Sequence, residues 1–164
     1  MDPITHAIVG AAISYAVGGR RLGRHAAGLG ALAGIVPDVD HFISSKSDPL
    51  LYVEFHRYFT HSIAFSFLGA FVPILPWLLR KKFHPLLWSL WICAWPAYLS
   101  HCLLDACTTW GTQLYWPFAP TRVSWDIIAI VDPLFTLVLA VMLAVALLRH
   151  SRHVALFTLV FALA

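Results

Sequence analysis

The segment Phe55-His56-Arg57-Tyr58-Phe59-Thr60-His61-Ser62 concentrates polar side chains in a chain that is otherwise largely apolar. It holds two imidazoles, one guanidinium and the hydroxyls of a threonine and a serine, and apolar runs precede and follow it. Hydrophobic residues make up 60% of the chain and charged residues 12%, whereas a soluble domain has about 25% charged residues. So few charges cannot cover a surface exposed to water. The composition therefore predicts a membrane protein with one polar site.

Six apolar runs set the expected architecture. They are Ile4–Val17, Ala26–Val36, Ser62–Leu79, Pro85–Leu104, Ile127–Leu148 and a last run that begins at Val154. We predict an all-α, polytopic membrane bundle of about five to six hydrophobic helices, with residues 1–164 as a single membrane-embedded domain. Some helices must be short, because the first run of about 14 residues reaches roughly 21 Å, less than the ~30 Å hydrocarbon core. The last run stops at Ala164, which predicts either a short final helix or a truncated C-terminus.

Local signals predict where several of these helices begin and end. Gly18-Gly19-Arg20-Arg21 is expected to end the first helix, and the Gly/Ala-rich second run is expected to pack closely against a neighbour. Thr60 is expected to cap the third helix, because its hydroxyl can accept a backbone N–H. Pro73 and Pro76 predict a kink near the far end of that helix. Asp132-Pro133 is typical of a helix cap and first turn. The alternative for Asp132, and the role considered for Asp126, is to hold a metal ligand in place.

Basic residues form three short clusters beside the first, third and fifth runs. The clusters are Arg20/Arg21/Arg24, Arg80/Lys81/Lys82 and Arg149/Arg152. If every run crosses the membrane, all three lie on one side, which the positive-inside rule identifies as the cytoplasm. The polar candidates then fall at the extracytoplasmic end. Basic residues placed in this way indicate membrane orientation, so the net charge of +3 gives no reason to expect a nucleic-acid partner.

Two pairs of residues are candidate metal ligands. His101 and Asp105 are four residues apart, so a helix places them on one face. There they can ligate one divalent ion, or the carboxylate can orient the imidazole. His56 and His61 converge only if His56 lies in a loop and His61 opens a helix, and Arg57 between them suits bidentate binding of phosphate. The alternatives are a buried His–Asp hydrogen bond and an interfacial loop whose histidines meet water.

Three further residues extend the candidate ligand set. Asp38 and Asp40 follow a helix that Pro37 closes, and carboxylates at alternate positions can bracket one or two metal ions. His6, near the start of the first run, is the third. His41 is a weaker candidate, because its side chain is expected to point away from that of Asp40. Solvation of a helix end is the alternative for the aspartates, and an interfacial position is the alternative for His6.

Four motifs occur in the order seen in one known family. They are His6-Ala7-Ile8-Val9-Gly10, Pro37-Asp38-Val39-Asp40-His41, His56-Arg57-Tyr58-Phe59-Thr60-His61-Ser62 and His101-Cys102-Leu103-Leu104-Asp105. Over most of its length the chain resembles the YdjM-like membrane-bound metal-dependent hydrolases. The resemblance implies a multi-pass protein of the bacterial or archaeal inner membrane and a hydrolase whose substrate is poorly defined. Tyr58 departs from the family pattern, in which a small residue such as glycine is expected.

We accordingly expect a metal-dependent hydrolase that acts on a lipid or amphipathic phosphoester through a metal-activated water. Imidazole and carboxylate ligands suit one or two zinc ions, with manganese or iron as alternatives. The predicted metal ligands are His6, Asp38, Asp40, His56, His61, His101 and Asp105. The predicted catalytic residues are Asp40, Asp105 and Arg57, and the predicted substrate-binding residues are Arg57, Thr60 and Thr109. Membrane lipids are the expected partners. A metal or proton transporter and an assembly protein with a structural metal site are the alternative functions.

Overall fold

The computed structural model describes residues 1–45, 47–48 and 50–163, and over these residues the chain is helical and contains no strand. The α-helices are α1 (Pro3–Leu22), α2 (Arg24–Ile35), α3 (Leu50–Phe55), α4 (Ile63–Gly69), α5 (Leu75–Leu78), α6 (Leu87–Ala106), α7 (Pro133–Leu148) and α8 (Arg152–Leu163). Four 3-10 helices complete the described elements: η1 (Val36–Phe42), η2 (Phe59–His61), η3 (Val72–Ile74) and η4 (Lys81–Leu86). The predicted all-α class is confirmed.

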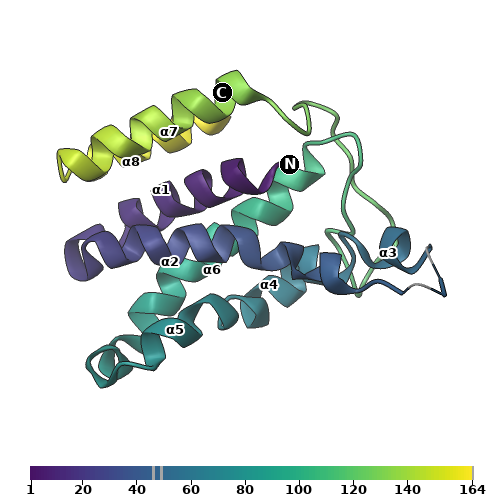
Figure 1. Ribbon diagram of the computed structural model, residues 1–164, viewed down its shortest axis with the longest axis horizontal. Coiled ribbons are helices and arrows are strands. Elements are labelled where there is room, and N and C mark those ends of the chain that lie inside the picture. Colours follow the sequence, from purple (N-terminus) through teal and green to yellow (C-terminus); the bar gives the residue numbers. More distant parts are fainter. Residues whose placement is uncertain (46, 49, 164) are drawn as a thin grey trace.

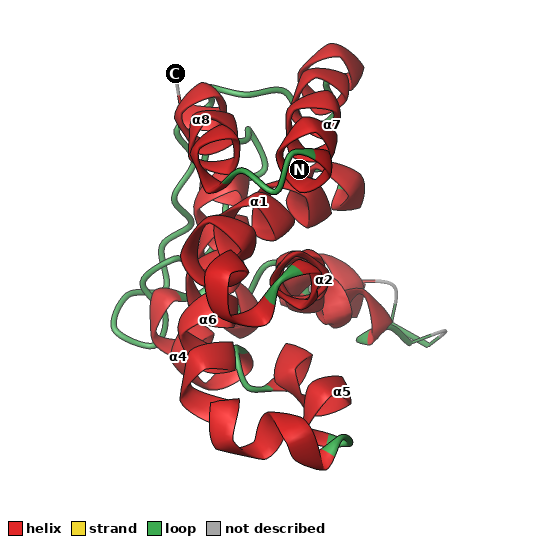
Figure 2. Cartoon of the chain, turned by 90° about the vertical axis from the view of Figure 1, so that its left-hand side faces the viewer, coloured by secondary structure: helices red, strands yellow, loops and turns green. Residues whose placement is uncertain are grey.

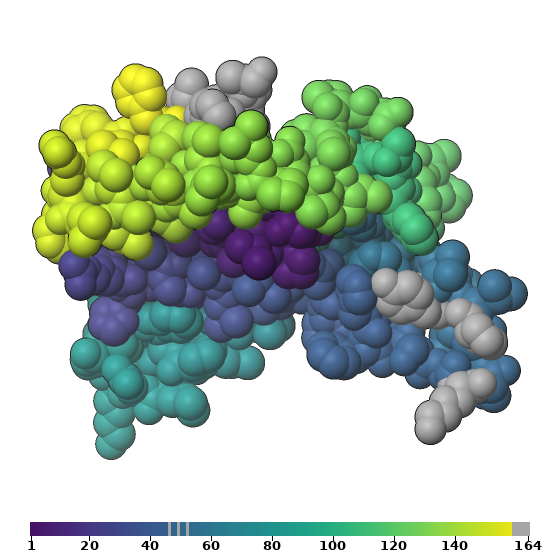
Figure 3. Space-filling view, turned by 45° about the horizontal axis from the view of Figure 1, so that its top comes forward, coloured from purple at the N-terminus to yellow at the C-terminus, as the bar shows by residue number. Residues whose placement is uncertain are grey.

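The helices stack in three levels with α1, α2 and α6 at the centre (Figure 2). α1 and α2 form an antiparallel hairpin, and α6 crosses it (Figure 1). α7 and α8 lie across α1 on one side (Figure 3), and α4 and α5 lie on the other side of the hairpin. The largest apolar core lies between α2, α4 and α6 and includes Leu29, Ile74, Leu90 and Tyr98.

α1 is longer than the sequence suggested. The Asp2 carboxylate caps its first turn by accepting the backbone N–H of Thr5 at 2.9 Å. The helix then continues through Gly18 and Gly19 and ends at Leu22, one residue past the predicted segment Gly18-Gly19-Arg20-Arg21. The break falls instead at Gly23, whose φ of +57° is a left-handed conformation that glycine adopts without strain. The turn at Gly23 folds α2 back onto α1.

Glycines allow α1 and α2 to approach closely, as the composition of the second run predicted. A Cβ atom added to Gly30 would lie 2.1 Å from the carbonyl oxygen of Gly10, and one added to Gly34 would lie 2.2 Å from that of His6. Real side chains do not tolerate such distances, so only glycine permits this helix spacing. The close approach places His6 of α1 beside the C-terminal end of α2.

The third apolar run is not one helix. α4 ends at Gly69, η3 follows it, and α5 is a single turn. Together they form the helical stretch Ile63–Leu78, close to the predicted Ser62–Leu79, and its irregular far end contains both prolines of the predicted kink. Pro73 and Pro76 each lie in the first turn of a short helix, where the missing N–H is tolerated. The cap is Ser62, whose Oγ accepts the backbone N–H of Phe65 at 3.1 Å, and not Thr60. The Thr60 hydroxyl is used elsewhere in the site.

Among the described residues, one continuous helical stretch, Lys81–Ala106, has the length and composition of a membrane span. A second candidate is the pair Val53–His61 and Ile63–Leu78, which is bent by 72°. The prediction of five to six membrane helices therefore stays a prediction. α7 begins at Pro133, six residues later than the predicted Ile127, and Asp132 caps it by accepting the backbone N–H of Phe135 at 3.0 Å. The predicted role of Asp132-Pro133 is confirmed.

The two ends of the molecule differ in chemistry. The α1–α2 turn, the end of α5 and the α7–α8 turn lie together at one end (Figure 1). These turns carry or adjoin the three basic clusters. α3 and the long loop that joins α6 to α7 lie at the opposite end (Figure 1), next to which the candidate site is built.

Candidate metal centre

Five separate segments contribute to the candidate site. η1 supplies Asp38, Asp40 and His41, the turn after α3 supplies His56 and Arg57, η2 supplies Thr60 and His61, α6 supplies His101 and Asp105, and α1 supplies His6. The sequence-predicted ligands therefore converge, although up to 99 residues separate His6 from Asp105 in the chain. Two overlapping groups of donor atoms result, and Asp38 belongs to both.

The first group, here called the inner centre, consists of Asp38, His61, His101 and Asp105. The Nε2 atoms of His61 and His101 are 2.9 Å apart. Both face Asp38 Oδ1, at 3.6 and 3.5 Å, and both face Asp105 Oδ2, at 3.3 and 3.5 Å. A tetrahedral zinc ion with ligands at 2.0–2.1 Å separates its donor atoms by about 3.3 Å. The spacing of the inner centre therefore fits a tetrahedral cation.

Hydrogen bonds at the outer nitrogens determine how the two imidazoles face the inner centre. His101 Nδ1 lies 2.6 Å from the carbonyl oxygen of Gly34, which can only accept, so Nδ1 carries the proton. His61 Nδ1 lies 3.1 Å from Asp40 Oδ2, which places its proton on Nδ1 in the same way. Each neutral ring then directs an Nε2 lone pair inward. A positive charge among these donors, from a metal ion or from protons on the imidazoles, offsets the repulsion between the two carboxylates.

Asp105 is the most enclosed carboxylate of the inner centre. Its side chain is 1% exposed, and its Oδ2 atom forms an ion pair with Arg57 Nε at 2.9 Å. Oδ1 contacts His6 Nε2 at 3.1 Å and the amino group of Met1. The His6 ring also stacks on His101, with ring centroids 3.7 Å apart. His6 therefore supports Asp105 and His101, while Asp105 Oδ2 faces the two imidazoles of the inner centre.

Arg57 is an internal residue of the site. It is 5% exposed, its Nε lies 2.9 Å from Asp105 Oδ2, and its NH1 donates to Thr108 Oγ1 at 2.8 Å. Its φ of +60° is rarely adopted by residues other than glycine and costs on the order of 1–3 kcal/mol. Asp40 Oδ2 accepts the backbone N–H of Arg57 at 2.9 Å, and the Arg57 carbonyl accepts from Gln113 at 3.2 Å. These two bonds hold the left-handed turn.

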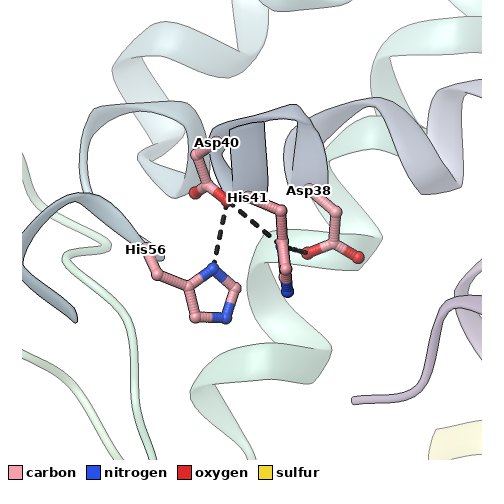
Figure 4. A group of neighbouring side chains, drawn as sticks. All are labelled: Asp38, Asp40, His41 and His56. Carbon is pink, nitrogen blue, oxygen red and sulfur yellow. Dashed lines mark hydrogen bonds and ion pairs between the residues drawn. The ribbon is translucent and has the colours of Figure 1, made fainter. Parts of the chain in front are cut away.

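The second group, here called the outer cluster, consists of Asp38, Asp40, His41 and His56 (Figure 4). His56 Nδ1 lies 3.1 Å from Asp40 Oδ1, and His41 Nδ1 lies 3.6 Å from the same oxygen. His41 is 46% exposed at its side chain, whereas His61, His101 and Asp105 of the inner centre are buried. The outer cluster is therefore the more open of two adjoining positions.

Hydrogen bonds keep the carboxylates of η1 ionised. Burial favours the neutral form of Asp38, but contacts from His101 and His61 outweigh it and hold the Asp38 pKa far below its usual value. Burial acts on Asp40 in the same direction, and contacts from His56, His61 and Thr60 likewise lower the Asp40 pKa. Both groups are anions at neutral pH.

The chain matches one protein family along its whole length. The matched family is described as YdjM inner membrane protein, and the match covers residues 1–164. The chain belongs to the YdjM family. The family assignment expected from the four motifs is therefore confirmed, and with it a location in the membrane. The sidedness of the site stays a prediction.

Two relatives are similar to this chain at 31% identity. One is inner membrane protein YbcI of Escherichia coli (strain K12), aligned over 132 residues, 77% of this chain and 75% of YbcI. The other is uncharacterized protein YfhP of Bacillus subtilis (strain 168), aligned over 141 residues, 81% of this chain and 42% of YfhP. The chain thus spans less than half the length of YfhP. No solved structure matches it.

In this YdjM-family chain, the structure places Thr60, Thr109 and Asp126 differently from what the sequence suggested. Thr60 donates its hydroxyl to Asp40 Oδ2 at 2.8 Å, so the Thr60 side chain supports the site from within. Thr109 is exposed, and its neighbour Thr108 is the threonine that contacts Arg57. Asp126 is exposed with a φ of +52°, and it belongs to neither donor group.

Sequence reasoning missed two contributors. His41 belongs to the outer cluster although it was expected to point away. Arg122 NH2 donates to the His56 carbonyl at 2.9 Å and so fixes the turn that carries His56 and Arg57. Burial and the nearby Arg57 charge lower the Arg122 pKa. The i, i+3 spacing of Asp38 and His41 is a signal that could have identified His41, whereas nothing in the sequence near Arg122 indicates its role.

Proposed function

We propose that this YdjM-family chain is a membrane-bound metal-dependent hydrolase that acts on a lipid or amphipathic phosphoester. One observation carries the proposal: the inner centre gathers two imidazole Nε2 atoms and two carboxylate oxygens around one point, with spacings of 2.9–3.6 Å. Mixed nitrogen and oxygen donors at such spacing suit zinc, with manganese or iron as alternatives. A divalent cation held there would lower the pKa of a bound water and supply a nucleophile near neutral pH.

The exposed side of the inner centre defines where a substrate would approach. The side chain of Asp38 is 14% exposed, whereas His61, His101 and Asp105 are at most 1% exposed. A substrate would therefore reach the centre past Asp38 and beside the outer cluster. The outer cluster offers a position for a second ion, which would share Asp38 with the first.

Buried residues around the inner centre have positioning and charge-balancing roles in this proposal. Asp40 holds the His61 tautomer that directs Nε2 inward, in the manner of a carboxylate–histidine–metal triad. Arg57 balances the charge of Asp105 and brings a cation next to the place where a phosphoryl group would gain charge. His41, half-exposed beside Asp38, is positioned to exchange a proton with solvent.

The placement of the basic turns supports a site on the extracytoplasmic side of the inner membrane. They lie at the end of the molecule opposite α3 (Figure 1), and basic residues collect on the cytoplasmic side. We propose that α1, α2, α7 and α8 share the hydrocarbon core with the span Lys81–Ala106, giving a multi-pass arrangement. Membrane lipids are then the proposed partners.

The test combines metal content with hydrolysis by the full chain purified in detergent. Zinc, manganese and iron are measured by mass spectrometry, and hydrolysis is assayed on bis(p-nitrophenyl) phosphate and a phospholipid panel. His61→Ala and Asp105→Ala should lose bound metal and turnover together. His153→Ala, which removes an exposed histidine outside both groups, should keep both. Stoichiometric metal without turnover on any ester would refute the hydrolase and leave a structural metal site.

A further inference from the structure

An apolar groove opens beside the inner centre. It has a volume of about 500 Å³, and Asp38 is part of its lining. Its walls come from η1 and α4, with Val39 on one side and Phe65, Gly69 and Val72 on the other. These last three residues follow an i, i+4, i+7 pattern, so the groove runs along one face of α4 and its extension.

The few polar side chains at the groove are engaged in hydrogen bonds or ion pairs. Tyr98 donates its hydroxyl to the Thr60 carbonyl at 2.9 Å, and Thr60 donates its own hydroxyl to Asp40. Asp38 faces the histidines of the inner centre. The remainder of the lining is hydrocarbon, so the groove suits an apolar ligand with its polar end at Asp38.

The rim of the groove indicates where that ligand comes from. Val39 is 54% exposed and Val72 is 50% exposed, and both are apolar. In a protein of the inner membrane, exposed apolar side chains face lipid, so the groove opens sideways to the acyl chains of the bilayer. A methylene group is about as large as a water molecule, whose volume is about 30 Å³. The groove therefore holds a chain on the order of a dozen carbons.

We infer that the groove binds one alkyl chain of a membrane amphiphile whose hydrolysable head group lies at Asp38. The inference rests on the proposed function, because it assigns the substrate class of that same centre. A volume of about 500 Å³ is enough for one such chain. Thr60 borders the inner centre, and α4 separates it from Val72 in the chain. Val72 is therefore the specificity-determining residue for the alkyl chain.

Two measurements on the full chain in nanodiscs test the inference. The first needs no turnover: dodecyl phosphonate with a diazirine at the chain end is photo-crosslinked and the labelled peptides are identified. We expect labelling to concentrate on the α4–η3 segment and to be competed by unlabelled dodecyl phosphonate but not by methyl phosphonate. Labelling spread evenly over the lipid-facing helices would overturn the inference.

The second measurement compares Val72→Trp with Val141→Trp, a matched change at a 54% exposed valine on α7. Zinc-loaded protein is assayed on dodecyl and methyl esters of p-nitrophenyl phosphate. Val72→Trp should lower the ratio of kcat/KM for the dodecyl ester to kcat/KM for the methyl ester at least tenfold, and Val141→Trp should leave that ratio unchanged. Equal loss on both esters, or no loss, would overturn the chain site while the hydrolase stands. Competed labelling of α4–η3 without turnover on any ester would support the chain site and refute the hydrolase.

Discussion

Asp40→Asn tests whether Asp40 positions the inner centre without binding its ion. The Asp40 carboxylate contacts four donors: His56 Nδ1, His61 Nδ1, the backbone N–H of Arg57 and the Thr60 hydroxyl. Asparagine has nearly the same shape, but one of its two terminal atoms becomes an NH₂ group that points at donors. The substitution therefore removes the acceptor that holds the His61 tautomer, or removes the one that holds His56.

The expected loss follows from the number of contacts disturbed. Removing the carboxylate partner of a metal-bound imidazole lowers metal affinity by roughly 10–100-fold, which is about 1.4–2.7 kcal/mol. A buried donor left without an acceptor costs a further 1–3 kcal/mol or so of folding free energy. We therefore expect a weaker zinc site and a lower thermal midpoint even in metal-free protein.

The assay is competition for zinc between the purified full chain and a chromophoric chelator, with thermal unfolding measured in parallel. Asp126→Asn is the matched control, since Asp126 is exposed, lies outside both donor groups and has a positive φ that asparagine tolerates. His61→Ala supplies the reference for loss of a true ligand. Unchanged zinc affinity would refute the positioning role, and loss as complete as in His61→Ala would show that Asp40 ligates the inner ion itself.

Three further predictions follow. Gly30→Ala should lower the thermal midpoint by several degrees, because its Cβ would meet the facing α1 carbonyl at 2.1 Å; Gly28→Ala, with its nearest neighbour at 3.7 Å, should not. Thr108→Val should lower kcat/KM about tenfold with zinc content unchanged, because the Arg57 guanidinium loses its neutral acceptor; Thr109→Val, an exposed site, should have no effect. The Asp40 pKa is lower in the folded state, so its stabilising contribution is present above the unfolded value near 3.9 and is lost as pH falls below it. The difference in thermal midpoint between metal-free wild type and Asp40→Asn should therefore shrink below about pH 4; a difference that stays constant from pH 7 to pH 3 would contradict this.

The pairs that share a helix or a short turn could be predicted because local geometry determines them. His101 and Asp105 lie four apart on α6 and approach within 3.5 Å, as a helical repeat requires. His56 does lie in a turn, as its convergence with His61 demanded, but His61 ends η2 and does not open the next helix. The sequence also revealed that the basic clusters and the site belong to opposite ends.

The features that could not be predicted are local backbone conformations that tertiary contacts determine. Thr108 and Thr109 are adjacent, and which one contacts Arg57 depends on where α6 ends, at Ala106. The break of the third run at Gly69 is not marked by a proline, since Pro73 and Pro76 come later. Arg57 adopts a positive φ that its residue type disfavours, because Asp40 and Gln113 hold it there. No pattern in a single sequence indicates any of these backbone conformations.

A single 3-10 helix explains why one short segment serves the centre, the groove and the outer cluster together. With about three residues per turn, η1 directs successive side chains to three sides. Asp38 enters the inner centre, Val39 lines the groove, Asp40 reaches the outer nitrogen of His61, and His41 returns to the side of Asp38. An α-helix would turn each of these residues by a smaller angle, and His41 would then fall out of line with Asp38. The tight helix, which begins with Pro37 in its first turn, thus joins the inner centre to the apolar groove, as the proposed function requires.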